Sequence, residues 1–279
     1  MWPDGLNREE TERVIQAALA EDVGEGDITT AAVIPVDTHF DGVLAAREPM
    51  VVAGLPVAAR VFQIVEPSAV FTQEVHDGDF IGAGTVLARI HGPAQGLMEA
   101  ERTALNLLQL LSGIATQARR YCDKIKGTDA IVLDTRKTIP GLRDLSKYAA
   151  RLGGATNHRI GLFDAILIKD NHIAVCGGVA TAVKRALASG HSPVEVECDT
   201  VEQVKEAVEA GAHIILLDNM DTDTLRACVA LIGGRAITEA SGGVTLDTIR
   251  AIAETGVNRI SVGRITQSAP AVDIGLDWS

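Results

Sequence analysis

Residues 134–172 carry an excess of positive charge within an acidic sequence. They include seven Arg or Lys residues and four Asp residues, whereas the 279-residue chain has a formal net charge of −12. A protein that binds nucleic acid would favour a broadly basic face, so the overall charge argues against that class of partner. A local group of cations suits a small polyanionic ligand held in one pocket.

These cations fall into two groups. Arg143, Lys147 and Arg151 recur every four residues, which is typical of one side of a helix, and we interpret them as a solvated helix face. The others lie beside Gly, Pro or Asn or at the end of an apolar run, where solvation alone explains them poorly. They are Arg136, Lys137, His158, Arg159 and Lys169.

Two carboxylates, Glu197 and Asp218, each follow a short apolar run. Such a pair could bind Mg²⁺, which takes oxygen ligands and often retains waters and substrate phosphates. It could also accept hydrogen bonds from sugar hydroxyls, or act as an acid/base pair as in glycosidases. The cations described above favour a phosphorylated sugar over a neutral glycan.

A Ser-Gly-Gly sequence, residues 241–243, precedes a predicted helix, and Gly263-Arg264 follows the next predicted strand. Glycine lets the backbone approach a ligand closely, and free N–H groups at the start of a helix point at an anion. Glycine also ends strands for purely structural reasons. The occurrence of both segments on consecutive units favours a phosphate site formed by Ser241, Gly242, Gly243 and Gly263.

Strands of a β/α domain must position these residues. After Gly127, short apolar runs alternate with amphipathic helical stretches, a pattern that predicts parallel strands joined by helical crossovers. No G-x-G-x-x-G opens the first unit, which disfavours a dinucleotide-binding sheet. We therefore expect a β/α barrel of eight strands or fewer, with chemistry at the C-terminal strand ends. The runs are 130–133, 165–168, 194–196, 214–217, 236–238 and 260–262.

The N-terminal part has a different sequence pattern. Residues 69–91 read as short strands joined by Gly turns and resemble the hammerhead fold of biotinyl and lipoyl carriers. A carrier needs a Lys on a hairpin tip, and residues 66–98 contain no Lys, so we interpret the segment as structural. A long helix is predicted from Pro93 to about Lys126. Arg102 lies off the centre of its apolar stripe and reads as a surface residue.

Composition bounds the remaining possibilities. The sequence is 47% hydrophobic and 22% charged, which is too apolar for a disordered chain. No secretory signal pattern is visible, and the most apolar run is about half the length of a membrane span. The four cysteines are widely spaced without a CxxC motif. We expect a cytoplasmic protein in a reducing compartment, with no zinc cluster and no membrane contact.

With these residues identified, the sequence resembles the quinolinate phosphoribosyltransferase family over nearly its whole length. The combination DTRKT-x-PG with NHR-x-GL-x-D-x-x-LIKDNH is highly specific. The matching segments are EDVGEGDITT (21–30), ERTALNLLQLLSGIAT (101–116), DTRKTIPGLRDLSKYA (134–149), NHRIGLFDAILIKDNHI (157–173), VEVE (194–197), ILLDNM (215–220) and EASGG (239–243).

The resemblance implies an α/β protein with an N-terminal, hammerhead-like α/β sandwich domain followed by an incomplete parallel β/α barrel. We expect the sandwich domain over residues 1–115, joined by a returning tail at 270–279, and the catalytic barrel over residues 116–269. The family couples quinolinate to 5-phosphoribosyl-1-pyrophosphate (PRPP) with Mg²⁺. The products are nicotinate mononucleotide, pyrophosphate and CO₂, on the route to NAD.

The resemblance also implies roles for individual residues. It assigns catalysis to Lys137, Lys169, Glu197 and Asp218. The quinolinate pocket takes Arg102, Arg136, His158, Arg159 and Lys169, with Arg102 donated by the partner subunit of a homodimer or larger homo-oligomer. The resemblance assigns the binding of PRPP and its phosphates to Lys137, Ser241, Gly242, Gly243 and Gly263. Glu197 and Asp218 are assigned to the metal, directly or through PRPP or water.

Two other functions remain open from the sequence. A related phosphoribosyltransferase could act on nicotinate or another base, although the Arg/His/Arg group favours a substrate with a second carboxylate. A non-catalytic sensor could bind PRPP or a nucleotide in the same pocket. Release of CO₂ separates quinolinate from nicotinate as the substrate, and formation of mononucleotide separates an enzyme from a sensor.

Overall fold

The computed structural model describes residues 2–278. The chain forms two compact units. The sandwich unit contains the chain up to Arg119, Thr138–Gly154 and the chain from Ile265 on, and the barrel unit contains Arg120–Lys137 and Ala155–Arg264. Among the described residues, no helix combines the length and apolarity needed to cross a membrane.

A four-stranded antiparallel sheet of order β12-β1-β5-β3 forms the centre of the sandwich unit. Its strands are β1 (His39–Ala46), β3 (Val70–Gln73), β5 (Val86–Pro93) and β12 (Ile274–Trp278), and β2 (Met50–Val51) pairs separately with β4 (Phe80–Ile81). The helices of this unit are α1 (Arg8–Val23), α2 (Ile28–Val33), α3 (Leu55–Val65), α4 (Ala94–Lys124) and α5 (Arg143–Leu152). α4 extends past Arg119, so its last residues are grouped with the barrel unit.

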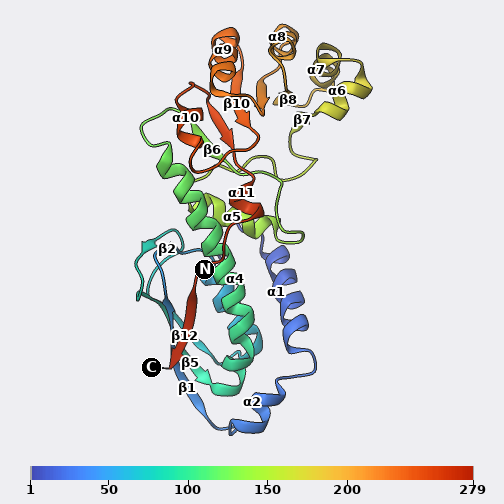
Figure 1. The fold of residues 1–279 in the computed structure, drawn as a ribbon. Helices are drawn as coiled ribbons and strands as arrows, with labels where there is room; N and C mark the ends of the chain where they lie inside the picture. Colours follow the sequence, from blue (N-terminus) through green and yellow to red (C-terminus); the bar gives the residue numbers. More distant parts are fainter. Residues whose placement is uncertain (1, 279) are drawn as a thin grey trace. The chain divides into compact units, whose positions relative to one another are not determined.

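Strand β12 comes from the far end of the sequence and lies beside β1 (Figure 1), with Gly42 opposite Trp278. The segment before β12 is bound to α4, because the Val272 N–H donates to the Gln109 carbonyl (3.2 Å). A Cβ at Gly113 of α4 would overlap the carbonyl oxygen of Pro270. Glycine at this position therefore lets the returning chain pass close to the helix.

Helix α5 packs within the sandwich unit, although residues 138–154 were predicted in the barrel domain. Its Tyr148 hydroxyl donates to Asp77 (2.8 Å), and its Asp144 accepts from the N–H of Asn7 (2.8 Å). The predicted solvated face of this helix is wrong for Lys147, which is only 3% exposed. Charge spacing indicated one side of a helix but not the surface against which that side packs.

Six parallel strands form the sheet of the barrel unit, in the order β6-β11-β10-β9-β8-β7. Among the described residues β6 and β7 stand at its two edges, so the barrel is incomplete and the predicted fold class is confirmed. The strands are β6 (Ile131–Leu133), β7 (Ile166–Ile168), β8 (Val194–Cys198), β9 (Ile214–Asp218), β10 (Ile237–Ser241) and β11 (Arg259–Ser261). The helices are α6 (Asp170–Cys176), α7 (Val179–Ala188), α8 (Val201–Ala210), α9 (Thr222–Ile232) and α10 (Ile249–Ala253). Helix α11 (Arg264–Gln267) begins at the last residue of this unit, and its other residues are grouped with the sandwich unit.

Alternation along the strands decides which side chains meet, because successive residues of a strand point to opposite faces. Glu195 and Glu197 of β8 therefore share one face, as do Glu239 and Ser241 of β10. The even-numbered neighbours, such as Val196, face the other side and are fully buried. Each of these two strands thus places two polar side chains on one face, two residues apart.

Candidate active site

A cavity of about 380 Å³ lies within the barrel unit at the C-terminal ends of its strands. It brings together most of the residues predicted from the sequence: Arg136, Lys137, His158, Arg159, Lys169, Glu197, Asp218 and Ser241. Four further lining residues were not predicted, and these are Thr135, Leu167, Leu216 and Ser261. The cavity combines four Lys or Arg side chains with two carboxylates, so it suits an anionic ligand.

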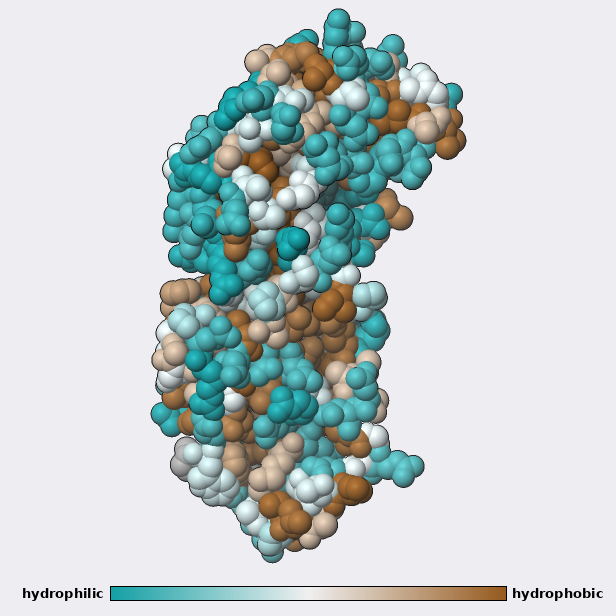
Figure 2. All heavy atoms as spheres, viewed as in Figure 1, coloured by the Kyte–Doolittle hydropathy of each residue, from teal (hydrophilic) through white to brown (hydrophobic). Residues whose placement is uncertain are grey.

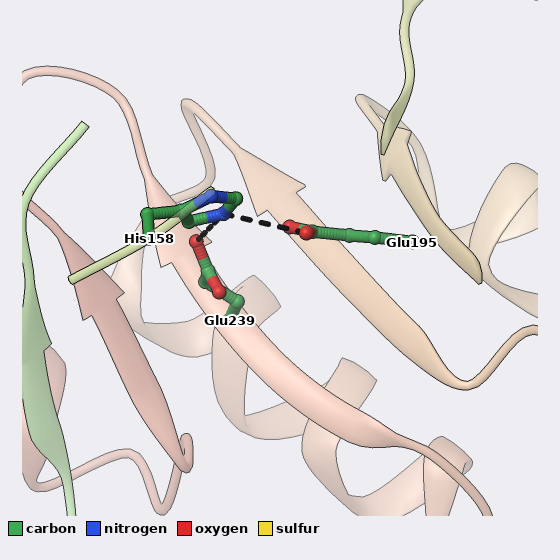
Figure 3. Close-up of side chains that lie close together, drawn as sticks. All are labelled: His158, Glu195 and Glu239. Carbon is green, nitrogen blue, oxygen red and sulfur yellow. Dashed lines mark ion pairs between the residues drawn. The ribbon is translucent and has the colours of Figure 1, made fainter. Parts of the chain in front are cut away.

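At the wall of this cavity, His158 lies between two buried glutamates (Figure 3). Its Nε2 atom is 3.3 Å from Glu195 Oε2 and 3.3 Å from Glu239 Oε1. The Glu239 side chain is 0% exposed, and the Ser261 hydroxyl donates a hydrogen bond to it. Sequence reasoning did not assign Glu195 or Glu239 a role. Alternation in the segment VEVE, residues 194–197, was the signal that could have placed Glu195 on the same face as Glu197.

Opposing effects act on the proton of His158. Burial lowers the pKa of His158, but hydrogen bonds and charges from Glu195 and Glu239 outweigh it and raise this pKa to about 9. The main-chain N–H of Arg159, however, donates to His158 Nδ1 (2.8 Å). Protonation of Nδ1 would break that hydrogen bond. The contact with the Arg159 N–H therefore favours the neutral ring and lowers the pKa of His158. We assign the neutral ring with its proton on Nε2, because both ring nitrogens then have suitable partners.

The same three residues offer a set of metal-ligand types, and their ligand atoms lie within 4.8 Å of one another. The 3.3 Å separations between His158 Nε2 and the carboxylate oxygens are hydrogen-bond distances. Bonds from Zn²⁺ to nitrogen or oxygen are shorter, about 2.0–2.2 Å. The carboxylates that line the cavity, Glu197 and Asp218, are the better candidates for a divalent ion that also contacts a ligand there.

Two guanidinium groups, those of Arg136 and Arg159, line the cavity together. Burial lowers the pKa of Arg159, and the nearby charge of Arg136 lowers it further. The Nη1 atom of Arg159 donates to the carbonyl of Ala165 (3.1 Å), which orients the planar group. A bound carboxylate would offset the repulsion between the two cations and accept bidentate hydrogen bonds.

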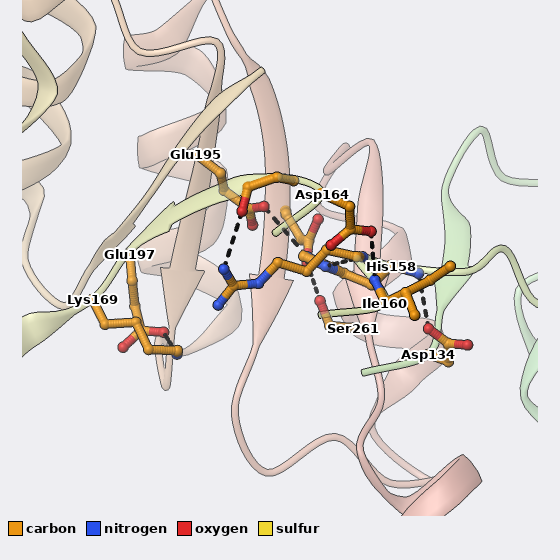
Figure 4. A network of polar contacts seen from close by, with 11 residues as sticks. Asp134, His158, Ile160, Asp164, Lys169, Glu195, Glu197 and Ser261 are labelled. Atoms are coloured by element: carbon orange, nitrogen blue, oxygen red, sulfur yellow. Dashed lines mark hydrogen bonds and ion pairs between the residues drawn. The ribbon is translucent and has the colours of Figure 1, made fainter. Parts of the chain in front are cut away.

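Lys169 and Glu197 form an ion pair at the ends of β7 and β8 (Figure 4). The Lys169 side chain is 45% exposed and that of Glu197 is 13% exposed. These residues were predicted to serve different ligands, and the structure joins them directly. Asp218, on the next strand, accepts a hydrogen bond from the side chain of Asn219 (2.6 Å).

Backbone geometry after β10 requires glycine. Gly242 has φ +88°, and a Cβ there would overlap the side chain of Asn219, whose own φ is +54°. The N–H of Asn219 donates to the carbonyl of Ser241 (3.0 Å), so the ends of β9 and β10 are joined here. Ser241 lines the cavity, whereas Gly242, Gly243 and Gly263 are not among its lining residues.

Arg102 lies in the sandwich unit, on α4, and its side chain is exposed. It is not among the residues that line the cavity. This exposed position agrees with the interpretation of Arg102 as a surface residue, which was based on its place off the centre of the apolar stripe. Its assignment to the quinolinate pocket depends on a partner subunit and stays a prediction.

Comparison with known proteins agrees with the sequence resemblance. Family models described as the N-terminal and C-terminal domains of quinolinate phosphoribosyl transferase match residues 27–112 and 114–277. The probable nicotinate-nucleotide pyrophosphorylase (carboxylating) of Bacillus subtilis is 41% identical over 274 residues, which cover 98% of this chain and 94% of that protein. The chloroplastic nicotinate-nucleotide pyrophosphorylase (carboxylating) of Oryza sativa subsp. japonica is 43% identical, with coverages of 94% and 76%.

A solved structure gives the same result at the level of the fold. The nicotinate-nucleotide pyrophosphorylase from Francisella tularensis superposes with a TM-score of 0.94 at 37% sequence identity, covering 98% of both chains. Both family domains and the full-length relatives therefore match this chain in sequence, and the solved structure matches it in fold. The chain belongs to the quinolinate phosphoribosyl transferase family.

Proposed function

We propose that this protein transfers the phosphoribosyl group of PRPP to quinolinate and releases pyrophosphate and CO₂, giving nicotinate mononucleotide for NAD biosynthesis. The observation that carries the proposal is the cavity that gathers Arg136, Arg159 and Lys169 beside the carboxylates Glu197 and Asp218. The membership of the chain in the quinolinate phosphoribosyl transferase family supports the choice of substrates.

Quinolinate is a dianion that carries its two carboxylates on adjacent carbons of a planar ring. The forked guanidinium groups of Arg136 and Arg159 suit these carboxylates, and Lys169 adds a compact positive charge. His158 lines the same cavity, but both of its ring nitrogens already have protein partners. We assign it to the quinolinate site as a residue that shapes the pocket.

PRPP occupies the other side of the cavity in this proposal. Lys137 and the segment Ser241-Gly242-Gly243, with Gly263, hold its phosphate groups through a side-chain charge and main-chain N–H groups. Glu197 and Asp218 would hold Mg²⁺, either directly or through PRPP or water. Bound Mg²⁺ would neutralise charge on the pyrophosphate.

The chemistry needs no dedicated base. The pyridine nitrogen of quinolinate attacks C1 of the ribose as the bond from C1 to the pyrophosphate oxygen breaks, and Lys137 stabilises the departing anion. The ring nitrogen becomes positive and stabilises the electron pair left on the adjacent carbon when its carboxylate leaves as CO₂. A proton from Lys169 or from water then completes the C–H bond.

The active form in this proposal is a homodimer or larger homo-oligomer, in which Arg102 enters the site of the partner subunit. Exposure of Arg102 on α4 supports this role. Large apolar side chains are also exposed on the barrel unit, including Leu162 (74%), Phe163 (85%) and Val175 (91%). Figure 2 shows hydrophobic patches among hydrophilic residues over α6 and α7. Such surface is typical of protein–protein contacts.

The proposed location is the cytoplasm. The four cysteines form no disulfide among the described residues, which suits a reducing compartment. A fusion to a fluorescent protein would test the location directly. Concentration of the signal at a membrane or outside the cell would contradict it.

Incubation of the purified protein with quinolinate, PRPP and Mg²⁺ tests the proposed reaction. We expect nicotinate mononucleotide and CO₂ in equal amounts, measured by chromatography and by release of label from the carboxylate next to the ring nitrogen. A parallel reaction with nicotinate, which lacks that carboxylate, should give little product. Mononucleotide formed from nicotinate without CO₂ would indicate the related transferase, and PRPP binding without product would indicate a sensor.

A further inference from the structure

The loop that carries Arg159 is held by side chains. Its main-chain N–H groups donate to carboxylates that lie before or after it in the sequence (Figure 4). A loop fixed at successive N–H groups has little freedom to move, so the starting point of the Arg159 side chain is well defined. The pairs are His158 with Asp134 Oδ1 (2.8 Å), Ile160 with Asp164 Oδ2 (2.7 Å) and Gly161 with Asp164 Oδ1 (2.9 Å).

Arg159 itself is held by the imidazole ring of His158. The main-chain N–H of Arg159 donates to His158 Nδ1 at 2.8 Å. This contact requires one orientation of the ring, with an unprotonated Nδ1 towards the loop and Nε2 towards the barrel interior. Any rotation of the ring would remove the acceptor from the Arg159 N–H.

Two strands fix the orientation of that ring. Glu195 of β8 and Glu239 of β10 each place one oxygen 3.3 Å from His158 Nε2, from different directions (Figure 3). Glu239 is held in turn by the hydroxyl of Ser261 on β11. Three strands of the barrel thus converge on the ring that supports Arg159.

This arrangement is an unfavourable way to stabilise a barrel interior. Glu195 Oε1 and Glu239 Oε2 are buried and have no hydrogen-bond partner among residues 2–278. Buried acceptors without partners reduce stability, and apolar side chains of similar volume often stabilise such positions. The role of the two carboxylates is therefore better sought in the geometry that they impose on His158.

We propose that Glu195 and Glu239 are positioning residues for recognition of the aromatic dicarboxylate, acting through His158 on the main chain of Arg159. This inference rests on the proposed function, because it concerns the same site. Neither glutamate is among the residues that line the cavity. Their effect on binding comes from placing the Arg159 guanidinium where it meets one carboxylate while Arg136 meets the other.

Replacement of each glutamate by an apolar or an amide side chain tests the proposal. Glu195→Leu and Glu239→Leu each remove one of the two acceptors beside His158 Nε2, whereas Glu195→Gln and Glu239→Gln each keep an acceptor oxygen at the substituted position. Binding is measured by calorimetry with benzene-1,2-dicarboxylate, which has the adjacent carboxylates of quinolinate but no ring nitrogen and cannot react. Turnover is measured in parallel with quinolinate and PRPP.

The two Leu variants should weaken dicarboxylate affinity and raise the KM for quinolinate by about 10- to 100-fold, because small displacements of a binding group have effects of this size. The Gln variants should stay within about threefold of wild type, since an amide oxygen still accepts the bond from Nε2. The KM for PRPP should change little in all four. Thermal unfolding of each variant is measured beside binding, and the dicarboxylate affinity of the Leu variants should fall even at temperatures well below their Tm.

Thr238→Val is the matched control. Thr238 is a buried neighbour of Glu239 on β10, and it bonds to Asn258 away from the cluster. This variant should lose stability without a selective loss of dicarboxylate binding. Ser261→Ala, which leaves both glutamates in place, should give a smaller loss of dicarboxylate affinity and covers the case in which a Leu variant does not fold.

Unchanged dicarboxylate affinity in the Leu variants would overturn the inference. So would an equal weakening for PRPP and dicarboxylate accompanied by a lower Tm, because that result indicates a structural role only. Failure of the proposed function gives a different result. Wild-type protein would then bind the dicarboxylate but form no mononucleotide from quinolinate and PRPP, and the binding comparison among variants would still decide the positioning role.

Discussion

The ammonium group of Lys169 is paired with the carboxylate of Glu197 across the ends of β7 and β8. Each residue is assigned to a different substrate, Lys169 to quinolinate and Glu197 to PRPP and its metal. In the proposed reaction, a carboxylate of quinolinate would compete with Glu197 for Lys169, and Mg²⁺ would compete with Lys169 for Glu197. The pair would then link the two halves of the cavity, because binding on one side would release a group for the other.

Replacement of the cations that face quinolinate should remove most turnover. Loss of one charged contact to a dianion in a desolvated pocket costs about 2–5 kcal/mol, so Lys169→Ala and Arg136→Ala should each lower kcat/KM by roughly 30- to 5000-fold. Steady-state rates with varied quinolinate measure the effect. Lys205→Ala, at an exposed lysine of α8, is the control. Wild-type turnover in Lys169→Ala would rule out its assigned role.

Removal of the divalent ion should stop the reaction. We expect EDTA to abolish turnover and added Mg²⁺ to restore it. Asp218→Asn should raise the Mg²⁺ concentration needed for half-maximal rate, because a neutral amide is a weaker ligand than a carboxylate. Asp223→Asn, at an exposed carboxylate on α9, should behave as wild type. Full activity in EDTA, or an unchanged Mg²⁺ requirement in Asp218→Asn, would contradict the metal assignment.

Mixed oligomers test whether Arg102 acts across a subunit boundary. Arg102→Ala and Lys169→Ala should each be nearly inactive alone, since each removes a cation from every site. If the two residues meet from different subunits, a dimer formed from one copy of each variant has one intact site. Random reassociation of equal amounts should recover about a quarter of wild-type activity.

Arg120→Ala is the control for that experiment, because Arg120 is likewise exposed on α4. It should be fully active alone, and mixing it with Lys169→Ala should give only the activity of its own subunits. Analytical ultracentrifugation checks that subunits exchange. Recovery of no activity from exchanged Arg102→Ala and Lys169→Ala mixtures would place Arg102 in the site of its own subunit, whereas full activity of Arg102→Ala alone would place it outside the site.

Asp77 should make a pH-dependent contribution to stability. Burial raises the pKa of Asp77, and hydrogen bonds from Gly54, Leu55 and Tyr148 offset only part of that effect. A carboxyl whose pKa is raised on folding contributes most below its unfolded pKa and loses that contribution as pH rises through the folded value. The loss of stability in Asp77→Ala should therefore be greater at about pH 4 than at about pH 7.

Urea unfolding of wild type and variant over that range gives the difference in free energy of unfolding. Asp22→Ala, at an exposed carboxylate of α1, is measured over the same pH series as the control. If the loss of unfolding free energy in Asp77→Ala grew with pH instead, the trend would have the opposite sign. That result would show that folding favours the ionised form of Asp77.

Much of the barrel could be predicted because its strands are nearly continuous apolar runs between polar residues. The run 214–217 corresponds to β9 (Ile214–Asp218), and the run 194–196 begins at the same residue as β8. Parallel strands bring their C-terminal ends to one edge, so the residues after three of the six runs, Lys169, Glu197 and Asp218, line the cavity.

The parts that were not predicted depend on contacts between segments distant in sequence. The meeting of His158 with Glu195 and Glu239 joins a loop to two strands that are not neighbours in the sheet. The burial of Lys147 depends on which unit receives α5, and periodicity gives only the face of a helix. Local pattern therefore indicated which residues carry chemistry, but not which residues hold them in place.

The return of β12 to β1 has a consequence for the order of folding during synthesis. The sandwich unit draws on three separate parts of the sequence, and its sheet is complete only when Ile274–Trp278 pairs with β1. The ribosome produces this strand after all the strands of the barrel unit. All strands of the barrel unit are therefore synthesised while β1 still has an open edge, and that edge stays available for wrong pairing until Ile274–Trp278 reaches it.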